Sequence, residues 1–161
     1  DDLVVYNGTA YYAKNGLTAA ADLITGSVIW SSTWKAQSVS ILPNRRVAAN
    51  ASGVYTFGED FLVIHHDFAG NLLWEHHNDS CYGAFNISHL IAGNDGSIYA
   101  TGYFGNCGLT KINSDGTIAW QTDVSSFSLA LFNNTLFVTA NAEAERDIIV
   151  RYDALTGSAL P

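Results

Sequence analysis

Four histidines lie close together in the sequence, and their side chains are the ones best suited to hold a metal ion. They form two adjacent pairs, His65-His66 and His76-His77. Imidazole nitrogens are common zinc ligands, but the ligands must converge on one point. A hairpin that turns at residues 67–70 pairs His65 with Leu72 and leaves His76 roughly 13 Å from His65 along the strand. Because neighbouring strand residues also point to opposite faces, we expect exposed polar side chains here and no metal site.

Other acidic or glycine-rich segments match no catalytic or cofactor motif. Asn94-Asp95-Gly96 and Asn113-Ser114-Asp115-Gly116 resemble pieces of calcium loops, but they lack the longer ligand series that ends in a bidentate acid. Gly102, Gly105 and Gly108 do not have the spacing of a dinucleotide-binding loop. The chain has neither a Gly-x-Ser-x-Gly nor a Cys-x-x-Cys sequence. We therefore predict no catalytic residue, no cofactor and no metal ligand.

The composition fits one folded domain. The chain has 161 residues, of which 48% are hydrophobic and 14% are charged. Such a chain can bury a core, and it is too rich in apolar residues for a disordered or collagen-like protein. The formal net charge of -8 and seven scattered Lys and Arg residues argue against nucleic acid, which binds clustered basic residues. No apolar run approaches the roughly 18 residues that cross a membrane, so we expect no membrane span.

A repeated Gly-x-x-x-Trp pattern divides the chain into four units. The complete copies are Gly26–Trp30, Gly70–Trp74 and Gly116–Trp120, and Gly157 begins a fourth copy that reaches Pro161 without a Trp. Successive glycines lie 44, 46 and 41 residues apart. A period of about 40–50 residues is typical of one four-stranded blade of a β-propeller. We interpret the repeated tryptophans as packing positions between neighbouring sheets, whereas Trp34 lies outside the repeat and its role stays open.

Each unit also contains strand-like segments separated by turns rich in Asn and Gly. These two residues tolerate the positive φ angles that tight hairpins need. Only residues 141–146 suggest a helix, and that segment is too short to be stable. The sequence therefore predicts an all-β fold, a β-propeller of about four blades with four antiparallel strands each, either incomplete or shared. The blades of this single domain are expected at residues 2–34, 38–77, 85–123 and 126–161.

The sequence resembles the repeat of the PQQ-like, or quinoprotein-type, β-propellers. The resemblance rests on Asp22–Trp30, which reads Asp-x-x-Thr-Gly-x-x-x-Trp, and on Tyr152–Gly157, which begins the same pattern. Asp67–Gly70 is one residue shorter and lacks the Thr. The resemblance implies that the Gly and Trp residues form the blade framework, and many members of the family are not enzymes. Its quinone-binding members place the cofactor on the axis of a complete ring, often beside a disulfide of adjacent cysteines, a pair that this sequence does not contain.

The repeat places two cysteines on one face of the propeller. Cys81 falls between the last strand of one blade and the first strand of the next, and Cys107 falls in the turn between the second and third strands of that next blade. Because these connections share a face, we expect a disulfide between Cys81 and Cys107. Such a bond implies an oxidising compartment.

Five Asn-x-Ser/Thr sequons occur where chance predicts about two. Asn7, Asn50 and Asn133 begin sequons in equivalent turns between first and second strands, whereas Asn78 and Asn86 lie in a connection on the opposite face. Asn and Ser also suit turns that carry no glycan. We expect N-linked glycans at most of the five sites. Together with the disulfide, they predict a secreted, extracellular protein whose leader has been removed.

Three functions remain open from the sequence. The one we favour is a non-enzymatic secreted glycoprotein that serves as a structural or assembly block. The alternatives are a propeller module that binds protein or glycan, and a fragment of a quinone-dependent dehydrogenase. From Gly157 through Pro161 to Asn7 the chain offers 11 residues for a join that takes 17 or 24 elsewhere, so four blades cannot close regularly. We therefore expect further blades, or copies that associate edge to edge into a ring or a fibre.

Overall fold

The computed structural model describes residues 2–14, 16–34, 46–57, 62–77, 87–102, 108–124, 126–142 and 146–161. These residues form four antiparallel sheets, each with four strands in chain order, and no helix. Sheet 1 contains β1 (Asp2–Tyr6), β2 (Thr9–Lys14), β3 (Leu17–Asp22) and β4 (Val28–Thr33). Sheet 2 contains β5 (Arg46–Asn50), β6 (Gly53–Phe57), β7 (Leu62–His66) and β8 (Leu72–His77). Sheet 3 contains β9 (Ile87–Ala92), β10 (Ile98–Gly102), β11 (Thr110–Ile112) and β12 (Ile118–Gln121). Sheet 4 contains β13 (Ser126–Phe132), β14 (Thr135–Ala142), β15 (Arg146–Asp153) and β16 (Ala159–Leu160).

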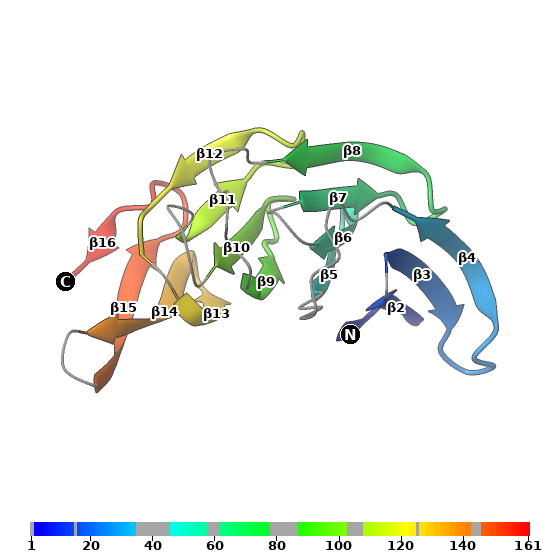
Figure 1. Cartoon of the computed structure of the whole chain (residues 1–161), viewed down its shortest axis with the longest axis horizontal. Coiled ribbons are helices and arrows are strands. Elements are labelled where there is room, and N and C mark those ends of the chain that lie inside the picture. Colours follow the sequence, from blue (N-terminus) through cyan, green and yellow to red (C-terminus); the bar gives the residue numbers. More distant parts are fainter. Residues whose placement is uncertain are drawn as a thin grey trace.

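The sheets stand side by side along an open arc (Figure 1). Strands β4, β8 and β12 follow its outer rim, and β5, β9 and β13 lie on its inner side. The expected all-β architecture of four-stranded antiparallel sheets is confirmed. In the described part of the chain, no helix has the length and apolar character needed to span a membrane.

Tight turns between first and second strands set the register of the inner hairpins. Asn7 and Gly8 have φ angles of 47° and 76°, and Tyr6 pairs with Thr9 across them. Asn133 and Asn134 have φ angles of 46° and 58° in the matching turn of sheet 4. Two consecutive positive φ angles define the turn that fits the twist of a hairpin, and Asn and Gly adopt them most readily.

The core lies between neighbouring sheets. Val47 and Val54 of sheet 2 pack on Tyr11 of sheet 1, and similar clusters fill the spaces between sheets 2 and 3 and between sheets 3 and 4. Each sheet therefore buries apolar residues on the face that meets its neighbour. This arrangement follows from the period of two along a strand, which sends alternate side chains to opposite faces.

Trp34, whose role the sequence left open, joins sheet 1 to sheet 2. Its side chain is buried against Leu62 and Ile64, and its Nε1 donates a hydrogen bond of 3.1 Å to Oγ1 of Thr18. The Thr18 hydroxyl lies 2.7 Å from that of Thr56 in sheet 2. The two buried hydroxyl groups and the indole N–H thus satisfy one another's hydrogen-bonding capacity.

Candidate functional site

Three tryptophans form the outer joints between sheets. Trp30, Trp74 and Trp120 each leave the fourth strand of one sheet and reach the turn before the fourth strand of the next sheet. Their Nε1 atoms donate to the carbonyls of Phe68 at 3.0 Å, Ser114 at 2.8 Å and Ala154 at 3.3 Å. The indole rings lie flat against Gly70, Gly116 and Gly157, so closely that a Cβ at each glycine would meet the ring at 3.0 Å or less. The structure therefore places these framework residues at the interfaces between sheets.

A tyrosine accompanies each of these tryptophans within its own sheet. The ring centroids of Tyr11 and Trp30, Tyr55 and Trp74, and Tyr99 and Trp120 lie 6.2, 5.9 and 6.0 Å apart. The hydroxyl of Tyr55 donates to the Gly96 carbonyl at 2.9 Å in the next sheet. Sequence analysis missed these tyrosines, although their constant spacing of 44 residues is a signal that could have identified them.

His65 and His66 do not form the exposed polar pair expected from the sequence. Both are buried, and they point to opposite faces of β7. The His65 ring stacks on Tyr55 with centroids 4.1 Å apart and meets Trp74 edge-on at 5.1 Å, whereas the His66 ring lies 5.6 Å from Trp30. The expectation of exposure was wrong because these positions lie under the tryptophan joints, where a large ring from a neighbouring strand or sheet covers each histidine.

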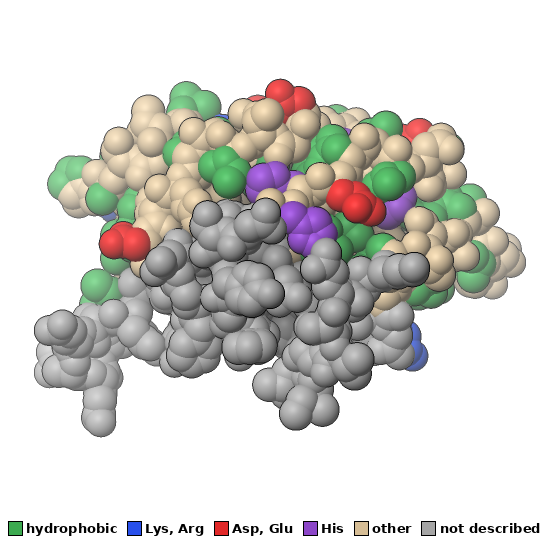
Figure 2. Space-filling view, turned by 45° about the horizontal axis from the view of Figure 1, so that its top comes forward, with side chains coloured by type: hydrophobic (Ala, Val, Ile, Leu, Met, Phe, Trp, Pro, Cys, Tyr) green, Lys and Arg blue, Asp and Glu red, His purple; other side chains and the backbone are tan. Residues whose placement is uncertain are grey.

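The pairing of these histidines also differs from the prediction. A bulge between His65 and His66 pairs His65 with Trp74, not with Leu72. His76 pairs with Val63 in the same hairpin and is half-buried, while His77 is exposed. Figure 2 shows histidine side chains at the surface near acidic ones, and no group of metal-ligating residues forms within the described ranges.

Burial lowers the pKa of both buried histidines below the ordinary value of 6.5. The His65 Nε2 donates to the Ser52 carbonyl at 3.0 Å, which opposes the effect of burial on its pKa without cancelling it. The Nδ1 atoms of the two histidines have no hydrogen-bond partner within the described part of the chain. Both imidazoles are therefore neutral at pH 7.

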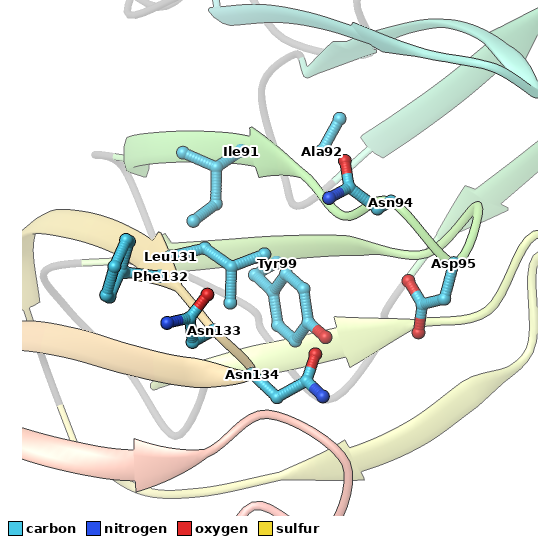
Figure 3. A pocket seen from close by; sticks show the side chains of 9 residues that line it. All are labelled: Ile91, Ala92, Asn94, Asp95, Tyr99, Leu131, Phe132, Asn133 and Asn134. Carbon is cyan, nitrogen blue, oxygen red and sulfur yellow. The ribbon is translucent and has the colours of Figure 1, made fainter.

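A hollow of the described surface lies between two inner turns, the β9–β10 turn and the β13–β14 turn. It has a volume of about 680 Å³ and is lined by the residues labelled in Figure 3: Ile91, Ala92, Asn94, Asp95, Tyr99, Leu131, Phe132, Asn133 and Asn134. We call this hollow the inter-turn cleft. Amide and carboxylate groups surround its mouth, and the buried Tyr99 forms its floor.

An ion pair fixes one wall of the inter-turn cleft. The Lys111 Nζ lies 3.0 Å from the Asp95 carboxylate and 5.5 Å from the centre of the Tyr99 ring. Burial raises the pKa of Asp95, but hydrogen bonds from Ser97 and Lys111 outweigh it, so the pKa lies below the ordinary 3.8. Burial opposes the charge of Lys111 as well, and the interactions with Asp95 and Tyr99 together outweigh it and raise the pKa of Lys111. Asp95 therefore presents a carboxylate held in one orientation.

The equivalent space between sheets 2 and 3 is closed. There Asn50 is buried, and its Nδ2 donates to the carbonyls of Gly93 at 2.9 Å and Ser97 at 3.3 Å. The Ser52 hydroxyl lies against Gly96 in the same contact. The inter-turn cleft is thus the corresponding space between sheets 3 and 4, and it is open.

The predicted glycosylation sites differ in their surroundings. Asn7 and Asn133 are exposed, whereas Asn50 has 6% of its surface exposed and uses Nδ2, the atom that would carry a glycan, in two hydrogen bonds. This arrangement does not fit glycosylation of Asn50, because a glycan would break both bonds. Asn78, Asn86, Cys81 and Cys107 lie outside the described residues.

Comparison with known proteins supports the fold. No family model matches the chain, and no match was found among curated proteins. The chain is similar to BamB from Moraxella catarrhalis, with 20% identity, a TM-score of 0.65 and coverage of 86% of this chain and 39% of that chain. It is also similar to a chain of the Mitotic Checkpoint Complex, with 15% identity, a TM-score of 0.71 and coverage of 94% of this chain and 47% of that chain. The chain spans less than half the length of either neighbour, and both are β-propellers, so its four sheets have the β-propeller fold.

Proposed function

We propose that this chain is a non-catalytic β-propeller module that binds a segment of another protein in the inter-turn cleft. The observation that carries the proposal is the open joint between sheets 3 and 4. In the neighbouring joint between sheets 2 and 3, the Asn50 side chain fills the space and donates to backbone carbonyls. A bound peptide can make the same kind of contact in the open joint between sheets 3 and 4. Propellers of similar fold include a chain of a protein complex, which supports a binding role.

The groups that line the inter-turn cleft suit an extended peptide. Asn94 and Asn134 offer both donors and acceptors, which can pair with peptide N–H and C=O groups. Phe132 has 67% of its surface exposed and provides an apolar contact beside them. The preferred partner is therefore a polar extended segment that carries an apolar residue.

A displayed peptide library selected against the 161-residue chain tests this role. Selected peptides should bind with affinities that fall by about tenfold or more in Asn94→Arg, because the long side chain fills the cleft. Ala51→Arg is the matched control, since Ala51 is exposed in the equivalent turn of sheet 2, outside the cleft. Equal binding to both variants would contradict the proposed site.

Within this proposal we assign the chain to the PQQ-like propellers. We also propose that the protein is an extracellular glycoprotein. The Gly and Trp positions of the three joints support the first assignment, and the exposed sequons at Asn7 and Asn133 support the second. Asn133 also lines the inter-turn cleft, so a glycan there would occupy its mouth. Glycopeptide masses from the native source should show glycans at Asn7, none at Asn50, and none at Asn133 in molecules that bind peptide. Full occupancy of Asn133 would favour the structural block over the binding module.

The structural block and the dehydrogenase fragment remain as the other functions. Exposed apolar residues on the two outermost sheets, among them Leu3 and Ile149, favour association with further sheets or copies. A quinone absorbance in protein purified from its source would favour the dehydrogenase, and its absence from active binding fractions would favour the module proposed here.

A further inference from the structure

The fourth strands of sheets 1, 2 and 3 each begin with two adjacent apolar side chains that are both exposed. These pairs are Val28-Ile29, Leu72-Leu73 and Ile118-Ala119. In a regular strand, adjacent side chains point to opposite faces. Here the register with the third strand shifts between the first residue of each pair and the tryptophan two positions later, so the second residue forms a bulge. The bulge breaks the alternation at the same place in three sheets.

Exposed apolar side chains are concentrated around these pairs. Leu72 and Leu73 have 53% and 51% of their surface exposed, and Phe68, in the turn before them, has 39%. We call the third turns and fourth strands of these three sheets the outer rim surface, which comprises residues 22–33, 67–77 and 113–121. It holds more than half of the large hydrophobic side chains that are exposed among the described residues. Figure 2 shows this side of the molecule, where apolar patches lie between acidic and histidine side chains. Apolar residues grouped in this way are typical of interaction surfaces.

The outer rim surface is also acidic. It contains neither Lys nor Arg, and it carries four carboxylates, those of Asp22, Asp67, Glu75 and Asp115. The three aspartates accept hydrogen bonds from neutral groups of their own turns, and these bonds lower the pKa of each carboxyl below the ordinary 3.8. Among the described residues, no Lys or Arg pairs with them, whereas Lys111 neutralises Asp95 in the inter-turn cleft. The negative charge of the outer rim surface is therefore available to a basic partner.

Three other occupants fit the outer rim surface poorly. A further sheet would continue the arc and meet sheet 1 or sheet 4, so it would leave the rim of sheet 2 uncovered. A second copy of the chain would bring another net charge of -8 against an acidic surface. A strand from a partner would need a regular edge on β8, which the bulge at Leu73 interrupts. A helix needs no such edge, and it can combine an apolar face with basic side chains beside it.

We propose that the outer rim surface binds a basic amphipathic helix of a partner protein. The apolar face of this helix lies on Phe68, Leu72 and Leu73, and its Lys or Arg side chains face Asp67 and Glu75. This inference is independent of the proposed function, because the inter-turn cleft lies at the inner turns and shares no residue with the outer rim surface.

Binding of three designed peptides to the 161-residue chain tests the proposal. The first peptide has about 18 residues of Leu and Lys, with Leu at the positions that form one face of a helix. The second has the same composition in strict alternation, which is the period of a strand. The third repeats the first with Glu in place of each Lys. Fluorescence anisotropy of dye-labelled peptides should show that the first binds at least about tenfold more tightly than the other two, and that added salt weakens its binding.

Paired substitutions locate the binding surface on the chain. Leu72→Ser combined with Leu73→Ser should weaken binding of the first peptide by about tenfold or more, because it removes the central apolar contact. Ile148→Ser combined with Ile149→Ser is the matched control, since these adjacent side chains are 45% and 71% exposed on β15, outside the outer rim surface. The control should leave the affinity unchanged.

Glu75→Gln tests the charge separately from the apolar contact. This substitution keeps the shape of an exposed side chain, and it should weaken binding of the first peptide by about twofold or more. Asp123→Asn removes an exposed carboxylate outside the outer rim surface and should not weaken it. Equal affinities of the two double variants would overturn the proposal, as would equal binding of the Lys and Glu peptides. Tighter binding of the alternating peptide would overturn it too, and would identify strand addition instead.

Discussion

At the scale of single residues, the two buried histidines make the stability of the fold depend on pH. Burial holds the pKa of His65 and His66 below 6.5, the value expected in the unfolded chain. As the pH falls below about 6.5, the unfolded chain binds more protons than the folded one, and the free energy of unfolding must decrease. Carboxylates such as Asp67 have a lowered pKa, and they lose their contribution to the free energy of unfolding only below the ordinary pKa of 3.8. The pH ranges in which histidines and carboxylates act are therefore separate.

We predict that urea unfolding followed from pH 7 to pH 5 shows a falling free energy of unfolding, and that His66→Phe reduces this slope. The aromatic replacement keeps a ring beside Trp30 and removes the titrating group. His77→Phe serves as the control because His77 is exposed. An unchanged slope in His66→Phe would show that other groups cause the pH dependence.

Asn50 gives a second prediction at this scale. Asn50→Asp replaces two donated hydrogen bonds with a carboxylate that faces the carbonyls of Gly93 and Ser97. Buried groups without partners cost about 1–3 kcal/mol each, so we expect a loss of about 2 kcal/mol in the free energy of unfolding. Asn7→Asp should change it by less than about 0.5 kcal/mol, because Asn7 is exposed. Equal effects of the two substitutions in urea denaturation would contradict the role given to Asn50.

At the scale of strands and sheets, the tryptophan joints are the contacts to test. Trp74→Phe removes the hydrogen bond to the Ser114 carbonyl but keeps a ring on Gly116, and should cost about 1 kcal/mol. Trp74→Ala also empties the space between the sheets, and should cost about 3 kcal/mol. Guanidinium denaturation of the two variants separates the hydrogen bond from the packing. Equal losses would mean that the ring itself contributes nothing.

The sheets could be predicted from the sequence because their signals are local. Each turn needs positive φ angles, which Asn7 and Gly8 reveal by their type, and each joint needs a large ring at a fixed distance from a glycine. The bulge between His65 and His66 could not be predicted, since one extra residue changes the register without changing the pattern of residue types. The burial of these histidines depends on rings in other strands, and the inter-turn cleft depends on how two distant turns approach each other. Such contacts between sheets leave no signal in either segment alone.

At the scale of the whole molecule, the ends of the arc differ from its middle. Leu3 and Leu129 each lie three positions before the last paired residue of the first strand in their sheets, and Leu129 is buried whereas Leu3 is exposed. We predict that Leu129→Ala lowers the free energy of unfolding by about 2–4 kcal/mol, whereas Leu3→Ala changes it by less than about 0.5 kcal/mol. Thermal unfolding of both variants of the 161-residue chain is the measurement. A large loss for Leu3→Ala would show that this chain already covers its first sheet, as self-association of copies would do.

The contacts between histidine and indole rings have an optical consequence. Trp74 meets His65 and Trp30 lies beside His66, whereas Trp120 has Tyr99 next to it. A protonated imidazole quenches the fluorescence of a nearby indole because it accepts an electron from the excited ring. On acidification of the folded protein, emission from Trp30 and Trp74 should therefore fall while that from Trp120 stays constant. The intrinsic fluorescence of these two tryptophans therefore reports the protonation of the buried histidines.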